Sequence, residues 1–311
     1  MSPSHPGRLR HKVGQRIATH ALWEAGHRVA VAVSGGQDSV ALLDLLCATA
    51  AWHRGALSVV HVDHQTRSDT AHDAAFVEEL SSKYGLPVVV ETVSGGPDAS
   101  EAQLREARYA VFDRLEVDRV ALAHHRRDQA ETVLLRLIQG AGQRGLGGMR
   151  WRRDRYVRPL LDVTRLELER WATLRGLSHR EDPSNASPRY LRNRVRAQVL
   201  PLLEALRPGA ERTIARAADH LAADEAFLEG LLEARALAAE GPWPLKELQA
   251  LPEPLFRRFC LRVARGLRTG QIDELTQLVK RGYGSCFAPT GWTWRVVDGW
   301  LEVALPADAG G

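Results

Sequence analysis

The chain has few of the residues that build cross-linked or metal-held scaffolds. Its 311 residues include three cysteines, Cys47, Cys260 and Cys286, which lie far apart in the sequence. This spacing excludes a CxxC metal or redox pair and provides no disulfide framework. Buried thiols are the expected use of all three.

Long apolar runs are also lacking. The most apolar run, residues 40–52, is interrupted by Asp44 and is too short to span a membrane. The first twelve residues, MSPSHPGRLRHK, contain no apolar stretch typical of a signal peptide. With 44% hydrophobic residues, the composition predicts a folded cytoplasmic protein that is long enough for two domains.

Acidic residues are scarce in one part of the chain. The net charge is +4, but residues 144–216 contain 17 Arg against 8 Asp or Glu, an excess of nine positive charges. The rest of the chain is therefore net negative by five. A concentrated basic block is typical of a polyanion-binding surface, and a solvated face has the same composition. Composition alone leaves both interpretations open.

Hydrophobic periodicity predicts alternating strands and helices over the first two thirds of the chain. The expected strands are 29–33, 57–62, 86–92 and 119–123, and the expected helices are 9–25, 39–50, 71–84, 100–115, 128–139, 164–175 and 190–206. This alternation predicts an α/β fold with a parallel sheet, helices on both faces, and ligands at the carboxyl ends of the strands.

Three later features organise the rest of the chain. Residues 140–149 are rich in glycine and are expected to form a mobile active-site loop rather than the interior of an element. An apolar stripe from Ile214 to Ala236, interrupted by Glu225, predicts one long helix. Residues 285–305, with Thr-Gly and Asp-Gly turns, predict a small hairpin. We place the domain boundary near residue 210, which gives domains of residues 1–210 and 211–311, the second smaller and mainly helical.

The most informative motif follows the first strand. Residues 29–33 lead directly into Ser34-Gly35-Gly36-Gln37-Asp38-Ser39 and then into an apolar helix. Two glycines allow close backbone approach, and the N–H groups of a helix start, with two serine hydroxyls, suit a phosphate. Asp38 would repel that phosphate unless a cation lay between them, so we assign Asp38 to Mg²⁺. A tight turn with a capping aspartate is the alternative, but it requires neither both serines nor both glycines.

SGGQDS lacks the Walker pattern and resembles the PP-loop of the ATP-pyrophosphatase superfamily, whose members adenylate an oxygen with ATP and release pyrophosphate. Further segments resemble the tRNA(Ile)-lysidine synthetase family in particular. They are His61-Val62-Asp63-His64-Gln65-Thr66-Arg67, then Ala123-His124-His125-Arg126-Arg127-Asp128-Gln129-Ala130-Glu131-Thr132, then Glu181-Asp182-Pro183-Ser184-Asn185 and Tyr190-Leu191-Arg192-Asn193-Arg194-Val195-Arg196. Together the matches cover residues 31 to about 201 in the correct order, and this combination is specific.

The resemblance implies a two-step reaction. ATP with Mg²⁺ adenylates O2 of the wobble cytidine of tRNA(Ile) with a CAU anticodon, and the ε-amine of free L-lysine then displaces AMP at C2. The nucleotide site is expected at Ser34, Gly35, Gly36, Gln37, Asp38, Ser39, His61 and Asp63. Catalysis is assigned to Asp38, Arg105, His124, Asp128 and Glu131, and tRNA binding to Arg192, Arg194 and Arg196. The C-terminal domain is expected to bind tRNA or to be accessory, and the oligomeric state, with a homodimer as one option, is left open.

The residues themselves favour part of this assignment. Asp128 and Glu131 are three apart at a helix start, so they share a face that suits an ammonium group, although an acidic pair also complements a helix dipole. The resemblance implies that Arg105 or Arg108 holds substrate, and spacing to His124 favours Arg105. The three arginines of residues 192–196 alternate along a helical segment, so they fan outward to phosphates or to solvent.

Two departures and two rival functions remain. Arg127 stands where the family often has a second acid, and the chain is shorter than the longer members, which carry a further C-terminal domain. A PP-loop tRNA thiolase or deazaguanine-forming synthetase would use cysteines, usually in closely spaced pairs, whereas these three are isolated. A non-catalytic ATP-binding module that docks on RNA through residues 144–216 is the rival from another class.

Overall fold

A computed structural model describes residues 6–63, 70–93, 100–180, 191–235, 237, 240–263, 269–287 and 293–304. The structure divides into two compact units, Met1–His220 and Leu221–Gly311. Helix α11 (Ala210–Glu233) contributes residues to both units. The boundary proposed from the sequence, near residue 210, lies at the first residue of this helix.

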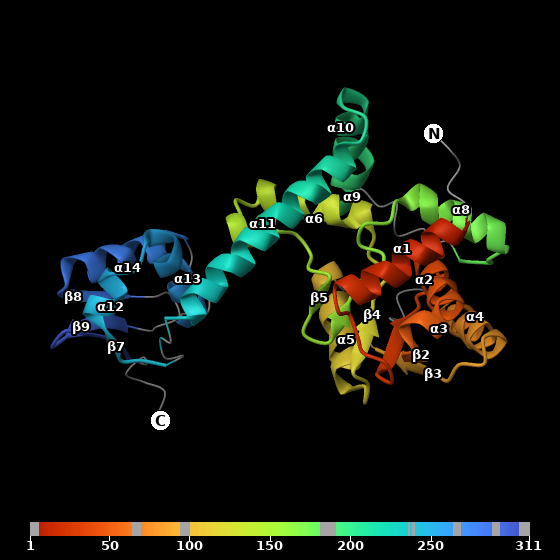
Figure 1. Ribbon diagram of the computed structural model, residues 1–311, viewed down its shortest axis with the longest axis horizontal. Coiled ribbons are helices and arrows are strands. Elements are labelled where there is room, and N and C mark those ends of the chain that lie inside the picture. Colours follow the sequence, from red (N-terminus) through yellow and green to blue (C-terminus); the bar gives the residue numbers. More distant parts are fainter. Residues whose placement is uncertain are drawn as a thin grey trace. The chain divides into compact units, whose positions relative to one another are not determined.

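The first unit, which carries the labels α1 and β2 in Figure 1, contains a six-stranded sheet. The strands lie in the order β3-β2-β1-β4-β6-β5. Its strands are β1 (Arg28–Ala32), β2 (Ala56–Asp63), β3 (Val88–Thr92), β4 (Arg119–Ala121), β5 (Arg152–Arg153) and β6 (Tyr156–Val157). All neighbours pair in parallel except β5 with β6. The expected parallel sheet is therefore confirmed. β2 and β4 lie on opposite sides of β1, and in such sheets ligands bind where the strand order reverses.

Helices cover both faces of this sheet, as predicted. On one face, Val29 and Val31 of β1 belong to a core with α1 (Pro6–Thr19), α2 (Gln37–Ala48), α4 (Thr70–Lys83) and α8 (Arg165–Arg175). On the other face, Ala30 packs in a cluster with Val111 and Phe112 of α5 (Glu101–Arg114). The short helix α3 (Ala50–His53) follows α2. Alternate residues of β1 are buried on opposite sides, which explains its continuous apolar run.

The segment expected to be one helix over 190–206 is three elements in the described part, α9 (Leu191–Arg194), the π-helical turn η2 (Val195–Val199) and α10 (Leu200–Leu206). Pro201 lacks the amide N–H that a continuous α-helix would use, and the π-helical turn lies immediately before α10. Val195 and Leu200 pack against Ala130 of α6 (Arg126–Ile138). The turn therefore lies against α6, the helix that carries Asp128 and Glu131.

The glycine-rich stretch differs from its prediction, because residues Gln143–Leu146 form the short helix α7. Arg136 Nη1 donates to the carbonyls of Gly145 and Gly148 at 2.7 Å each. Gln129 contacts the backbone of Met149 twice, donating at 3.0 Å and accepting at 2.7 Å. The expectation that no element forms here was wrong. Side chains from α6 hydrogen-bond to the backbone of this stretch and hold it in place.

The second unit combines helices with an antiparallel sheet of order β7-β10-β9-β8. Its elements after α11 are β7 (Trp243–Pro244), α12 (Leu245–Gln249), α13 (Glu253–Val263), α14 (Thr269–Arg281), β8 (Gly284–Phe287), β9 (Thr293–Val297) and β10 (Trp300–Ala304). The predicted hairpin is confirmed as β9 and β10, with Asp298 and Gly299 at φ of +48° and +80° in the turn. Glu225, which interrupts the apolar stripe of α11, is buried and accepts a hydrogen bond from buried Arg258.

No helix in the described ranges is long and apolar enough to cross a membrane.

Asp44 is the buried polar centre of the first unit. It is 1% exposed, although it lies in the apolar helix α2. Its carboxylate accepts hydrogen bonds from the Tyr84 hydroxyl at 2.6 Å, Trp171 Nε1 at 2.8 Å and Arg175 Nη2 at 3.0 Å. Burial, followed by the hydrogen bond to Asp44, raises the pKa of Tyr84. Asp44 therefore holds α2 against α8 and against the end of α4.

We predict that Asp44→Ala lowers the free energy of unfolding by about 2–4 kcal/mol, because the Trp171 and Tyr84 donors lose their acceptor in a dry site. Urea denaturation of the full chain measures the difference. Glu169→Ala is the control, since its exposed pair with Arg165 should contribute about 0.5 kcal/mol or less. Equal effects of the two substitutions would show that water replaces the Asp44 carboxylate at little cost.

Candidate active site

The phosphate loop, residues 34–39, connects β1 to α2 and requires glycine at position 35. Gly35 has a φ of +86°, a conformation that residues with a Cβ rarely adopt. Ser39 Oγ donates to the Gly36 carbonyl at 2.8 Å and accepts from Ser34 N–H at 3.2 Å, so the serines shape the loop itself. Gly36 precedes α2 without a side-chain cap. The first N–H groups of α2 therefore remain available to an anion.

His125 links this loop to α6. Its Nε2 lies 3.4 Å from Asp38 Oδ2, and its Nδ1 accepts the N–H of Arg127 at 3.1 Å. These partners place the ring proton on Nε2, facing Asp38. Burial alone would lower the pKa of His125, but the carboxylates of Asp128 and Asp38 outweigh it and raise the pKa. Sequence reasoning did not select His125, because the expected helix began at residue 128, whereas α6 begins at Arg126 and makes His125 its N-cap.

The acidic pair of α6 is already in contact with arginines. Glu131, 0% exposed, accepts from Arg192 Nε at 2.9 Å and from Arg196 Nε at 2.6 Å. Asp128 Oδ1 lies 3.2 Å from Arg192 Nη2 and 3.3 Å from Arg196 Nη2. Asp128 Oδ2 also accepts the N–H of His125 at 2.9 Å, which caps α6. The structure thus joins two predicted catalytic acids to two predicted tRNA-binding arginines.

The electrostatics keep this cluster charged. Burial would raise the pKa of Asp128, but the charges of His125 and Arg192 and the hydrogen bond from the His125 N–H lower it. Burial would lower the pKa of Arg196, yet its hydrogen bond to Glu131 outweighs burial and raises it. The Asp128 carboxylate and the Arg196 guanidinium are therefore both ionised at neutral pH.

The remaining predicted catalytic residues, His124 and Arg105, lie beside a buried arginine. His124 follows β4, and its Nδ1 is shielded from solvent with no hydrogen-bond partner among the described residues. Arg105 Nη2 donates to the Tyr109 hydroxyl at 3.0 Å, on α5. Arg158, which follows β6, is 3% exposed and interacts with Tyr109. Sequence reasoning missed Arg158, whose only local signal is its place after a short apolar segment.

The other predicted residues differ in their surroundings. His61 is buried and its Nδ1 contacts the Val33 carbonyl at 2.8 Å, which connects the end of β2 to the segment before the phosphate loop. Arg194 is exposed and makes no ion pair within the described residues, unlike Arg192 and Arg196. Asp63 is the last residue of β2. Residues 64–67 and 181–190 of the motifs lie outside the described residues.

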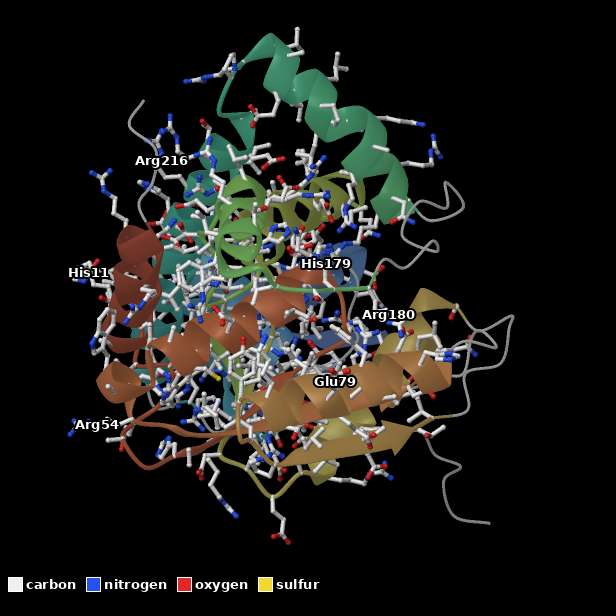
Figure 2. The ribbon with its side chains drawn as sticks, turned by 90° about the vertical axis from the view of Figure 1, so that its right-hand side faces the viewer. His11, Arg54, Glu79, His179, Arg180 and Arg216 are labelled. Atoms are coloured by element: carbon white, nitrogen blue, oxygen red, sulfur yellow. The ribbon has the colours of Figure 1, made fainter. Side chains whose placement is uncertain are left out.

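The backbone N–H of Arg180 donates to the Gly35 carbonyl at 2.9 Å, and its guanidinium donates to the His72 carbonyl at 3.1 Å. Figure 2 labels Arg180 beside α4. Arg180, at the end of a described range, therefore lies next to the phosphate loop.

Comparison with known proteins finds similarity over most of the chain. Residues 9–203 match the family model of a PP-loop domain. A tRNA(Ile)-lysidine synthase of Geobacter sulfurreducens is 44% identical over 235 residues, which cover 71% of this chain and 50% of the relative. A tRNA(Ile)-lysidine synthase of Thermosynechococcus vestitus is 34% identical over 310 residues, which cover 93% of this chain and 90% of the relative.

The chain belongs to the tRNA(Ile)-lysidine synthase family.

This membership confirms the predicted family and the ATP-using ligase class. The chain covers half of the Geobacter relative and most of the Thermosynechococcus relative. Among solved structures, the U34-tRNA thiolase NcsA from Methanococcus maripaludis has a TM-score of 0.58 at 18% identity, covering 69% of this chain and 78% of that chain. This likeness shows that the two proteins share the fold.

We predict that Glu131→Ala lowers the free energy of unfolding by about 2–4 kcal/mol, because two partly buried guanidiniums lose their shared carboxylate. Denaturant titration measures the loss, and hydrogen exchange should show weaker protection in residues 191–200. Glu211→Ala is the control, since its 3.5 Å contact with Arg127 should contribute at most about 1 kcal/mol. Unchanged protection would show that apolar packing alone holds η2 on α6.

Proposed function

We propose that this chain ligates free L-lysine to C2 of the wobble cytidine of tRNA(Ile) with a CAU anticodon, converting ATP to AMP and pyrophosphate. The observation that carries the proposal is the line of contacts Asp38–His125–Asp128. It joins the phosphate loop after β1 to the acidic start of α6 after β4, on neighbouring strands. A site for ATP and a site for an amine are thereby adjacent, as a ligase requires.

The adenylation step is assigned to the phosphate loop. The N–H groups at the start of α2 receive the negative charge that develops on pyrophosphate when cytosine O2 attacks the α-phosphorus. Asp38 is 41% exposed at this loop and suits Mg²⁺, which commonly takes one or two carboxylates together with phosphate oxygens. Bound there, Mg²⁺ would neutralise phosphate charge. His125 orients the Asp38 carboxylate through its Nε2–H.

The geometry favours different roles for the two acids of α6. Both Glu131 oxygens accept from arginines and the side chain is fully buried, so Glu131 holds Arg192 and Arg196 in place. Asp128 retains 12% side-chain exposure and is the acid that meets an ammonium group. Its lowered pKa makes it a weak proton acceptor for an amine whose ordinary pKa is about 10.4. Asp128 is therefore proposed to bind and orient the lysine amine rather than to deprotonate it.

The tRNA contact is assigned within residues 192–196. Arg192 and Arg196 are held by carboxylates, and an ion-paired arginine offers less net attraction to a phosphate. Arg194 is exposed without such a partner in the described residues, so it is the best phosphate contact of the three. Arginines elsewhere in residues 144–216 would extend this surface.

One experiment separates this proposal from the rival functions. Formation of AMP and pyrophosphate should require both tRNA(Ile) and free lysine, and mass measurement of the tRNA should show one added lysine. A non-catalytic RNA-docking module would bind ATP and tRNA without forming AMP. A thiolase would add sulfur to the tRNA and would not require lysine.

We predict that Asp38→Asn lowers the rate of tRNA-dependent pyrophosphate release by at least about a hundredfold, because phosphate charge is no longer balanced in the adenylation step. Radiolabelled ATP measures the release, and circular dichroism verifies folding. Glu79→Gln is the matched control, since Glu79 is an exposed acid of α4, labelled in Figure 2. Adenylation at the wild-type rate by folded Asp38→Asn would remove Asp38 from the metal site.

We predict that Asp128→Asn raises the lysine concentration required for half-maximal ligation by roughly tenfold to a hundredfold, because a charge-assisted hydrogen bond to the amine is lost. The adenylated tRNA should accumulate, since the phosphate loop lies on another strand. The measurement traps this intermediate and titrates lysine with both proteins. An unchanged lysine dependence would restrict Asp128 to capping α6 and pairing with arginines.

A further inference from the structure

Arg158 is a buried cation without a carboxylate partner in the described part of the chain. It is 3% exposed; its Nη1 donates to the Arg150 carbonyl at 2.8 Å, and its Nε is shielded from solvent without a hydrogen-bond acceptor. Buried Arg258 differs, because it donates to the Glu225 carboxylate. An isolated buried charge is strongly unfavourable unless an anion meets it. Arg158 therefore has the properties of a binding group rather than of a structural ion pair.

The surroundings of Arg158 are positively charged and polar. Arg105 places its guanidinium 4.7 Å from the Tyr109 ring, and Tyr109 also interacts with Arg158. Burial lowers the pKa of His124, and the charges of Arg158, Arg192 and Arg105 lower it further, against the opposing effect of Asp128. We refer to Arg105, Tyr109, His124 and Arg158 as the Arg158 cluster. It combines guanidinium donors with a neutral imidazole whose buried Nδ1 has no partner in the described residues.

The position of the cluster separates it from the phosphate loop. β6 pairs with β4 in the register Val157↔Ala121, so Arg158 and His124 both lie past the carboxyl ends of these strands. β1, which leads to the phosphate loop, pairs with the opposite edge of β4. Neighbouring strands are about 4.8 Å apart. β6 and β1 are two strands apart, so about 10 Å in total separates them. The acidic start of α6 follows β4, between the two.

We propose that the Arg158 cluster binds the α-carboxylate of the amino acid substrate, a site that rests on the proposed ligase function. Lysine is long enough, through its four-carbon stem, to place its reacting amine near Asp128 and its carboxylate one strand further from the ATP. The Arg158 guanidinium would donate to the carboxylate in the forked geometry that arginine forms with such groups. His124, with its ring proton on Nδ1, would donate to the same carboxylate.

This placement explains why a carboxylate rather than a phosphate is the ligand. The phosphates of ATP have their own donors in the phosphate loop. This loop follows β1, which pairs with the edge of β4 opposite to β6. An amino acid, unlike a simple diamine, carries a negative charge that a buried guanidinium without a carboxylate partner would select. The enzyme should therefore distinguish lysine from cadaverine, which has the same reacting amine and no carboxylate.

The experiment compares lysine with cadaverine as the amine, using the full chain, tRNA(Ile) and ATP, with product tRNA analysed by mass. The wild type is expected to use lysine at least about tenfold more efficiently than cadaverine, as the loss of a charge-assisted contact requires. In Arg158→Met the ratio of lysine efficiency to cadaverine efficiency should fall to about one, mainly because lysine is used less efficiently. Arg158→Lys retains the positive charge but lacks the paired N–H groups of the guanidinium, so it should keep part of the preference for lysine.

The matched control is Arg258→Met, which removes a buried arginine of the second unit. This substitution leaves Glu225 buried without its cation, so the unfolding temperature of Arg258→Met should fall further than that of Arg158→Met. The preference of Arg258→Met for lysine should stay at the wild-type value. A greater fall for Arg158→Met would identify Arg158 as a structural group and overturn the proposal.

Two further outcomes are decisive. Equal use of lysine and cadaverine by the wild type, or an unchanged preference in Arg158→Met, would show that Arg158 does not bind the carboxylate. This wild-type comparison needs no variant to fold. Absence of any amine-modified tRNA with either compound, under conditions where ATP binds, would instead contradict the proposed ligase function. Pyrophosphate release measured without amine reports the adenylation step separately.

Discussion

The buried ionic network of Asp128, Glu131, Arg192 and Arg196 is the interaction on which the site depends. Its members come from α6 and from the α9–η2 segment, more than sixty residues further along the chain. A carboxylate as deeply buried as Glu131 is tolerable only beside cations, so the network determines where residues 192–196 lie. Asp128 has a second task, because it also caps α6 through the His125 N–H. The Asp128 carboxylate thus positions both α6 and the arginines Arg192 and Arg196.

The same network extends toward the phosphate loop. His125 is held by the cap of α6, and its Nε2–H then faces Asp38 on the phosphate loop. Since β1 and β4 are adjacent, this contact needs no mobile segment. The groups proposed for adenylation and for amine binding are therefore held by rigid elements, which favours the close placement that two consecutive steps on one base require.

Buried charges elsewhere in the chain show what a purely structural arrangement looks like. Asp44 has donors from Tyr84, Trp171 and Arg175, and Glu225 has Arg258. In each case the opposite charges within the protein balance one another, and no ligand is needed. Arg158 does not follow this pattern within the described residues, and it lies past the carboxyl end of a strand, where ligands bind in sheets of this type. The contrast between the paired and the unpaired cations is what separates stabilising positions from a substrate position.

Local pattern by itself determined the parallel sheet, its main helices and the phosphate loop. Apolar period, helix caps and the positive φ at Gly35 act over a few residues, so the sequence displays them directly. Strands β5 and β6, two residues each, are too short to show a period. Tertiary structure alone decided that Arg136 and Gln129 order the glycine-rich stretch, and that Arg192 and Arg196 meet Glu131. It also decided that Arg158 has no carboxylate neighbour in the described residues. The physical reason is that a charged side chain takes the partner nearest in space, and long-range packing sets that distance.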